Sequence, residues 1–349
     1  MNGQEKKSLD VWVPRCLVGG GIEILSASLT AEGLCSLRIG WEGSVISSLE
    51  PIKHVPDSSL KLLLPRFVEP HAHIDKAFTW NEVPNLDGDY QGALDANLRE
   101  HKERMPHDVF VRAERSLMLA LKNGYRAVRS HIDSFGPFTP QNWEVLVSLQ
   151  REWHSLIELQ LVALVHLDYW STSQGQLLAG RVAEAGGLLG GVLVPPFDKR
   201  ASFALLSQLI RTANKLGCGI DLHIDESHKH PAEGIKLLIE VLDQNETNVP
   251  ITCSHASSMG LLSPEPLRRL ADRLAYHEVN VVALPLTNAW LLGRRARETP
   301  VQRPLAPISQ LQQSGVMVGV GGDNVQDPWL PIGNFDPLAL MSLSMPLAQ

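Results

Sequence analysis

Short apolar runs rich in β-branched residues recur along the chain and divide it into two regions of different texture. Up to residue 65 these runs are separated by turn residues and show no helical period. We expect strands over Val11–Val18, Leu34–Gly40 and Val45–Leu49, with a hairpin turn at Trp41–Gly43. Residues 1–65 therefore predict a small β module that resembles an incomplete β-sandwich.

Residues 66–349 alternate apolar strands with helical patterns. From the second strand onward the strands begin roughly 30 residues apart, which is the length of one βα unit. Eight such units predict an α/β fold, a closed (β/α)8 TIM barrel, because closure removes both edges of the sheet. The predicted strands are Arg66–Pro70, Tyr125–His131, Leu159–Val165, Gly190–Pro195, Gly219–Ile224, Val249–Ser254, Val279–Pro285 and Val316–Gly321.

Several of these strands lead into short segments that carry a His or an Asp. The segments contain His71 and His73, then His223, His255 and Asp323. Residues two apart on a strand point to the same side, so His71 and His73 can both face the barrel axis. The C-terminal ends of TIM-barrel strands converge on the face that carries the active site. Imidazoles and a carboxylate gathered there suit a divalent ion such as Zn²⁺ or Fe²⁺.

A single His-x-His pair has a simpler explanation, since coincidence or a surface pair of histidines gives the same spacing. The argument for a metal site depends on the three further segments, which deliver the same residue types to the same face. His131 also ends a predicted strand. It is either a direct neighbour of the metal site or a structural histidine of the barrel rim.

Composition narrows the class of partner. Hydrophobic residues make up 44% of the chain and charged residues 20%, which is typical of a globular domain. The net charge of −7 and the lack of a basic cluster disfavour nucleic acid or an anionic membrane as a partner. No window of 18 apolar residues predicts a membrane span. Four cysteines without a Cys-x-x-Cys pair, and an N-terminus without a signal-peptide pattern, favour a cytoplasmic location.

The strand-end segments resemble the motifs of the amidohydrolase superfamily. Residues 67–76 look like its first-strand motif, and the chain is similar to the cytosine deaminase branch, which is related to the triazine-type amidohydrolases. The resemblance covers nearly the whole chain and all eight strands in order. The segments that carry it are Phe67–Lys76, His223–Glu226, Ser254–Ser257, Pro285–Asn288 and Gly322–Trp329.

The resemblance implies a single divalent metal ion, Zn²⁺ or Fe²⁺, as cofactor. Its ligands would be His71, His73, His223 and Asp323. Superfamily members with two metals need a bridging lysine at the end of the fourth strand. Here that strand ends in residues 193–198 without a lysine, and Lys199 lies past the turn. We therefore expect one metal.

The resemblance also implies the catalytic residues. A divalent ion lowers the pKa of a bound water from 15.7 to about 7. His255 and Asp323 would orient this water and accept its proton. Glu226 would be the proton shuttle that protonates a ring nitrogen and then the leaving amine. The alternative for Glu226 is an exposed loop carboxylate.

Three residues are expected to contact the substrate. His166 stands where cytosine deaminases carry a glutamine that grips the pyrimidine edge, and an imidazole offers a different set of hydrogen bonds. Asn324 follows Asp323 where stricter cytosine deaminases have a second Asp. Trp329 is a candidate to close the pocket over a flat ring, or a packing residue of its loop. His166 and Asn324 disfavour cytosine itself.

The C-terminal end departs from the family pattern. Family members continue with strands that return to the N-terminal module, and the chain ends at Gln349. Unpaired strand edges would remain, which favours a homo-oligomer. A fragment, a partner subunit over the edge and a decaying gene are the alternatives. We expect a shortened chain whose barrel still closes.

Together these observations predict a metal-dependent amidohydrolase. It would hydrolyse a C–N bond of a small aminated heterocycle or cyclic amidine with metal-activated water and release ammonia. Within enzymes, the alternative is a hydrolase of cyclic amides or N-acyl compounds with the same metal site. A shortened, non-catalytic homologue is the alternative from another class.

Overall fold

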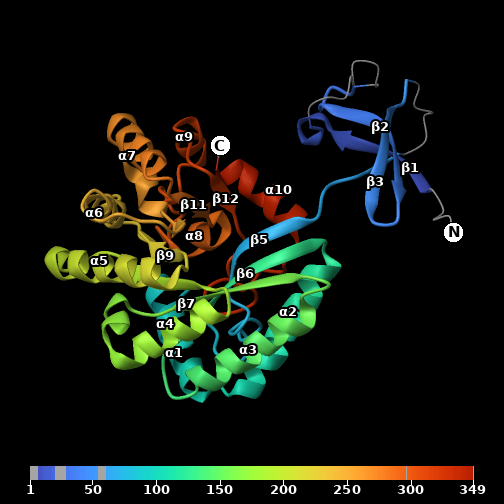
Figure 1. Ribbon diagram of the computed structural model, residues 1–349. Coiled ribbons are helices and arrows are strands. Elements are labelled where there is room, and N and C mark those ends of the chain that lie inside the picture. The colour runs from blue at the N-terminus through green and yellow to red at the C-terminus, as the bar shows by residue number, and fades with distance from the viewer. Residues whose placement is uncertain (1–6, 20–28, 54–59, 296, 349) are drawn as a thin grey trace. The chain divides into compact units, whose positions relative to one another are not determined.

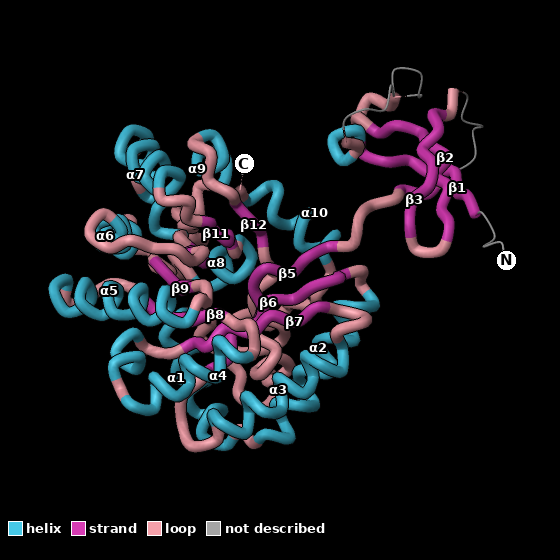
Figure 2. Tube along the Cα trace, viewed as in Figure 1, coloured by secondary structure: helices cyan, strands magenta, loops and turns pink. Residues whose placement is uncertain are grey.

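The structure is a computed structural model that describes residues 7–19, 29–53, 60–295 and 297–348. The chain forms two compact units, Met1–Arg66 and Phe67–Gln349. Figures 1 and 2 show the strands and helices of both units. Each unit is described by itself below.

The described part of the first unit is a four-stranded sheet with the order β3-β2-β1-β4. Its strands are β1 (Lys7–Pro14), β2 (Leu34–Glu42), β3 (Val45–Pro51) and β4 (Lys61–Leu62). β2 pairs antiparallel with β1 and β3, and β4 runs parallel to β1. Alternate residues of β1 and β2 form a small apolar core that contains Val11, Cys35 and Leu37.

Three details of this sheet differ from the sequence prediction. The first strand starts at Lys7 and stops at Pro14, because the chain turns into the 3₁₀ helix η1 (Arg15–Leu17). The hairpin turn lies at residues 43 and 44, whereas residues 41–43 were expected, and Gly43 has a φ of 61° that suits glycine. Strand β4 was not predicted, since its two residues are too short for a pattern.

The second unit is the predicted (β/α)8 barrel. Its eight strands lie in the order in which they follow along the chain, and neighbouring strands are parallel. Figure 2 shows them grouped at the centre of the unit with helices around them. The strands are β5 (Phe67–Ala72), β6 (Tyr125–Asp133), β7 (Glu158–Leu164), β8 (Leu188–Leu193), β9 (Ile220–Ile224), β10 (Ile251–His255), β11 (Asn280–Ala283) and β12 (Val318–Val320).

The barrel closes between its first and last strands at residues of the predicted site. Ala72 and Asp323 form a parallel bridge between the ends of β5 and β12. The main-chain N–H of Asp323 donates to the carbonyl oxygen of His71 at 3.0 Å. Closure therefore fixes the backbone of two predicted metal ligands against each other.

The helices complete the βα units. The predicted seventh strand is shorter than expected, since Pro285 begins helix α8, and proline is well suited to the first turn of a helix. Helix α1 is an additional element between β5 and α2. The helices are α1 (Tyr90–Glu103), α2 (Pro106–Lys122), α3 (Thr139–Trp153), α4 (Ser173–Glu184), α5 (Lys199–Leu216), α6 (Glu233–Leu242), α7 (Pro264–Tyr276), α8 (Pro285–Leu291), α9 (Ile308–Gln313) and α10 (Pro337–Leu347), with the 3₁₀ helices η3 (Leu167–Ser171) and η4 (Ser257–Leu261).

Apolar side chains between strands and helices form the main core of this unit. Val128, Leu161 and Leu222 from the strands pack in one cluster with Leu117 and Leu209 from the helices. Among the described helices, none combines the length and the apolar character needed to cross a bilayer.

Candidate metal centre and substrate pocket

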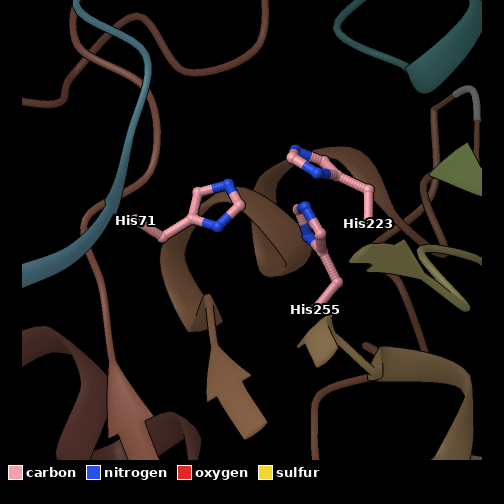
Figure 3. A group of neighbouring side chains, drawn as sticks. All are labelled: His71, His223 and His255. Carbon is pink, nitrogen blue, oxygen red and sulfur yellow. The ribbon is translucent and has the colours of Figure 1, made fainter. Parts of the chain in front are cut away.

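The four predicted metal ligands converge at the C-terminal ends of three strands. His71 lies in β5, His73 follows that strand, His223 lies in β9 and Asp323 follows β12. The Nε2 atom of His73 lies 3.3 Å from Nε2 of His71, 3.4 Å from Nε2 of His223 and 3.3 Å from Oδ1 of Asp323. Nε2 of His71 lies 3.5 Å from the same oxygen. Figure 3 shows the rings of His71 and His223 turned toward one another beside His255.

These spacings suit a common metal ion. Ligand atoms about 2.05 Å from a tetrahedrally coordinated zinc lie about 3.3 Å from one another. Both carboxylate oxygens of Asp323 are buried and make no hydrogen bond of normal geometry with the described residues. Buried polar atoms without partners are rare and call for an explanation such as an ion. The donor set and its spacing therefore fit one divalent cation.

The imidazoles are prepared to act as ligands. Burial lowers the pKa of His71, His73 and His223 well below the usual value, which keeps the rings neutral. Nδ1 of His73 lies 3.1 Å from the main-chain oxygen of His131 and donates to it. The proton of His73 is then on Nδ1, and its Nε2 presents a lone pair to the cluster. His73 therefore presents its ligand atom in the form that binds a cation, and the rings of His71 and His223 are neutral as well.

The backbone at these strand ends is held in an uncommon conformation. Asp225, His255 and Asp323 have φ values of 54°, 72° and 65°. Non-glycine residues pay about 1–3 kcal/mol for such left-handed conformations, and these residues cluster at functional sites. The main-chain N–H of Ala256, which follows His255, bonds the carbonyl of Ile224 at 2.9 Å and holds this geometry.

Glu226 is placed by the residue before it. The carboxylate of Asp225 accepts the main-chain N–H groups of Gly234 at 2.9 Å and Ile235 at 2.8 Å, at the start of α6. This anchor turns the chain after β9 so that Glu226 lines the pocket, with only 5% of the residue exposed. The alternative of an exposed loop carboxylate does not describe Glu226.

Glu226 and His255 face each other across the pocket floor. Oε1 of Glu226 lies 3.4 Å from Nδ1 of His255, and Nδ2 of Asn288 lies 3.1 Å from the same nitrogen. Burial and then the charge of Asp323 raise the pKa of Glu226 well above its usual value, which favours the protonated acid. Burial lowers the pKa of His255 to about 3. An amide nitrogen only donates, so Nδ1 of His255 is an acceptor and Nε2 carries the proton.

A cavity of about 150 Å³ opens beside these residues. One wall comes from α1 through Tyr90, Leu94 and Asn97, and Phe135 and Leu164 add further apolar lining. Pockets for drug-sized ligands enclose about 300–1,000 Å³, so this cavity suits a small compound. The role of α1 as a pocket wall was not predicted, because the segment between the first two strands carries no recognised motif.

The predicted substrate residues all line this cavity. His166 is exposed at the end of β7. The side-chain nitrogen of Asn324 donates to Asp327 at 2.7 Å, so this amide also organises its own loop. The ring of Trp329 is nearly buried and packs edge-on against Tyr90, at 5.1 Å between centroids, while its Nε1 has no partner within the described chain.

A buried ion-pair network forms another part of the wall and was not predicted. Nζ of Lys76 lies 3.3 Å from Asp133, and both residues line the cavity. Arg104 at the end of α1 donates to Asp75 at 2.7 Å, to Asp133 at 3.2 Å and to Glu100. Through Arg104, Asp75 and Asp133 thus tie the end of α1 to the ends of β5 and β6, and Lys76 joins the network through Asp133. The sequence did carry a signal for this network, namely the charged residues Asp75 and Lys76 after β5 and Asp133 at the end of β6.

The structure also answers two questions left by the sequence: whether a bridging lysine is present and where His131 lies. No lysine lies at the end of β8, and Lys199 begins α5, where it pairs with Glu240 at 2.7 Å. The ring of His131 stacks on His71 at 3.8 Å between centroids, and its Nε2 lies 3.7 Å from Asp221. His131 therefore contacts a predicted ligand directly, through its ring, and supports His73 through its carbonyl oxygen.

Comparisons with known proteins show which family the chain is similar to. A model of the amidohydrolase family matches residues 173–346. The chain is 32% identical over 320 residues to a pterin deaminase from Rhizobium rhizogenes strain K84, an alignment that spans 88% of this chain and 72% of the relative. It is 21% identical over 339 residues to N-isopropylammelide isopropyl amidohydrolase from Pseudomonas sp. strain ADP, spanning 95% of this chain and 78% of that protein.

Solved structures share the fold. The crystal structure of 5-methylcytosine deaminase from Klebsiella pneumoniae liganded with 5-fluorocytosine superimposes with a TM-score of 0.78. The match covers 97% of this chain and 81% of that chain at 22% identity. The predicted barrel is thereby confirmed. The chain belongs to the amidohydrolase family and is a hydrolase of carbon–nitrogen bonds other than peptide bonds.

Proposed function

We propose that the chain is a deaminase with one divalent metal ion that removes an exocyclic amine from a small, flat, aminated heterocycle or cyclic amidine. The supporting observation is the arrangement of three neutral imidazoles and the Asp323 carboxylate, 3.3–3.5 Å apart, next to a buried Glu226 in the pocket wall. In the overall reaction a C–O bond forms to water, the C–N bond breaks and ammonia leaves.

His71, His73, His223 and Asp323 would hold the metal, which is Zn²⁺ or Fe²⁺ in this proposal. When bound there, such an ion lowers the pKa of a coordinated water to near neutrality. Side chains of the protein carry out the remaining steps. Asp323 takes a proton at its free carboxylate oxygen. The Nε2–H of His255, without a partner among the described residues, orients the attacking oxygen.

Glu226 supplies the proton for the leaving group. Its raised pKa keeps the carboxylic acid form available near neutral pH, as a general acid requires. Its proton goes first to a ring nitrogen. Glu226 would then take the proton of the newly added hydroxyl group and give it to the departing amine, and the proton held by Asp323 would return to Glu226 as ammonia leaves. Asn288 holds His255 so that the carboxyl group of Glu226 stays at the pocket floor.

The pocket supports a small, planar substrate. His166, Asn324 and Trp329 are proposed to contact it, with Trp329 covering the ring face and the other two reading its polar edge. Since the relative with 32% identity is a pterin deaminase, pterins are the first compounds to test. Aminated pyrimidines, triazines and cyclic guanidines form the comparison set.

A cytoplasmic location and a homo-oligomer are further parts of the proposal. The free, buried thiols of Cys35, Cys218 and Cys253 support a reducing compartment. Light scattering on the purified chain would measure the oligomeric state. We propose a barrel domain of residues 66–349 and a β module of residues 1–65, which limited proteolysis would test.

A screen for ammonia release tests the proposed function. The purified chain, supplied in turn with Zn²⁺, Fe²⁺ or Mn²⁺, is incubated with each compound, and ammonia is measured with a coupled enzyme. We expect release from at least one compound class with metal and none from the Asp323→Ala variant. A metal-loaded chain that releases ammonia from no aminated heterocycle, yet hydrolyses an N-acyl compound, would contradict the deaminase assignment.

A further inference from the structure

Below the ligand cluster, a line of hydrogen bonds crosses the barrel interior from β6 to β5. Nη1 of Arg129 donates to Oδ2 of Asp221 at 2.8 Å. The hydroxyl of Ser254 donates to Oδ1 of the same carboxylate at 2.8 Å. Oγ of Ser254 lies 2.8 Å from Nδ1 of His71. Asp221, Ser254 and His71 are completely buried, so no solvent competes for the two bonds that join them, while the side chain of Arg129 is partly exposed.

The direction of each proton follows from the chemistry of the groups. The guanidinium of Arg129 is always charged, and a carboxylate paired with it is ionised and only accepts. The single hydrogen of the Ser254 hydroxyl therefore points to Asp221. The Ser254 oxygen is then the acceptor for His71, which must carry its proton on Nδ1. The lone pair of His71 is left on Nε2, the atom that faces His73 and Asp323.

His71 differs in this respect from the other two histidine ligands. His73 is oriented by a main-chain carbonyl, and Nδ1 of His223 has no partner within the described ranges. Among the three histidine ligands, His71 is thus the one whose tautomer is set by hydrogen bonds to side chains. The neighbouring ring of His131 stacks on its face and leaves the Nδ1 contact to Ser254.

We propose that Arg129, Asp221 and Ser254 form a positioning relay that holds His71 in its Nδ1–H form and makes its Nε2 a stronger donor to the metal. The three are positioning residues, because each acts through His71. This inference rests on the proposed function in one respect, namely that His71 is a metal ligand. Partners that orient ligating histidines typically change metal affinity by about 10–100-fold when they are removed.

The relay is tested by the Zn²⁺ affinity of the full chain at neutral pH, measured by competition with a chromophoric chelator. Ser254→Ala removes both hydrogen bonds and is expected to weaken Zn²⁺ binding about 10–100-fold. Asp221→Asn keeps an acceptor for Ser254 but loses the charge, and a smaller loss is expected. Ser254→Thr retains the hydroxyl and should restore affinity to within about threefold of wild type.

Ser116→Ala is the matched control. Ser116 is also completely buried and donates to a main-chain oxygen, of Arg112, but lies in α2 away from the ligands. This variant should bind Zn²⁺ as the wild type does. A serine that merely fills the barrel would lower the melting temperature of the metal-free chain and leave the affinity unchanged.

The outcomes separate the relay from the proposed function. Wild-type affinity in folded Ser254→Ala and Asp221→Asn variants would overturn the relay, even if the wild-type chain binds Zn²⁺ and releases ammonia. A wild-type chain that takes up no Zn²⁺ would instead overturn the metal site on which the proposed function depends. Weakened binding in Ser254→Ala with recovery in Ser254→Thr would support the relay.

Discussion

Replacing Glu226 by Gln is the sharpest test of the proton-transfer step. Glutamine has nearly the same shape and can still contact Nδ1 of His255, which lies 3.4 Å from the carboxyl oxygen. It cannot hold and release a proton. General acid–base groups contribute about 10²–10⁴-fold, and each factor of ten corresponds to about 1.36 kcal/mol. We therefore expect kcat to fall by this factor, a barrier increase of about 3–5 kcal/mol.

Metal binding and substrate affinity should survive this substitution. The close polar contact of Glu226 is with His255, which is not among the proposed ligands. Metal content should stay at the wild-type value and KM should change by no more than about threefold, since Gln keeps the shape of the pocket. Because the pKa of Glu226 is shifted upward, the wild-type rate should decline as the pH rises through that pKa and the acid form is lost.

The assay is steady-state ammonia release with metal content measured on the same sample. Glu233→Gln is the control, because Glu233 lies at the exposed start of α6 and pairs only loosely with His230. It should leave kcat and KM unchanged. A Glu226→Gln variant with at least half of wild-type kcat would refute the shuttle role.

The same geometry makes predictions for the metal, the pocket wall and the buried ion pairs. Dialysis against a chelator should abolish ammonia release and lower the melting temperature, and added Zn²⁺ should restore both; full activity after complete metal removal would contradict the metal site. Trp329→Ala should raise KM about 2–10-fold, the effect of about 0.5–1.5 kcal/mol of ring stacking, and Trp329→Phe should restore it; an unchanged KM would argue for a packing role. Arg104→Met should lower the free energy of unfolding by about 3–5 kcal/mol in denaturant titrations, because it leaves buried carboxylates unpaired. The control is the exposed ion pair of Arg38 and Asp10. Arg38→Met should lower the free energy of unfolding by less than about 1 kcal/mol, and a loss equal to that of Arg104→Met would contradict the argument from burial.

The sequence predicted the barrel because eight apolar strands carry a strong, repeated signal. It also placed the candidate ligands, since the C-terminal ends of parallel strands meet at one face. His71, His73, His223 and Asp323 come from segments as much as 252 residues apart, yet the topology alone brings them together. The hydrogen bond between the main chains of His71 and Asp323, which closes the barrel, fixes the positions of these two ligands relative to each other.

The pocket wall formed by α1 and the supporting residues Arg129, Asp221 and Ser254 were not predicted, for different reasons. Helix α1 is an insertion in the βα repeat, and its role depends on where Arg104 anchors it. Asp221 did leave a signal: it stands two residues before His223 in an otherwise apolar strand, so both point to the same side. Arg129 and His131 repeat this pattern in β6. Polar residues at alternate positions of buried strands therefore mark the supporting groups of such a site.

The proposed chemistry depends on one divalent ion held by three histidines and Asp323. Elemental analysis of the purified, metal-supplied chain tests it most directly, with folding of every variant checked by circular dichroism. We expect one divalent ion per wild-type chain and near-zero content in folded His73→Ala and Asp323→Ala variants. Two ions per wild-type chain, or wild-type metal content in folded Asp323→Ala, would contradict it.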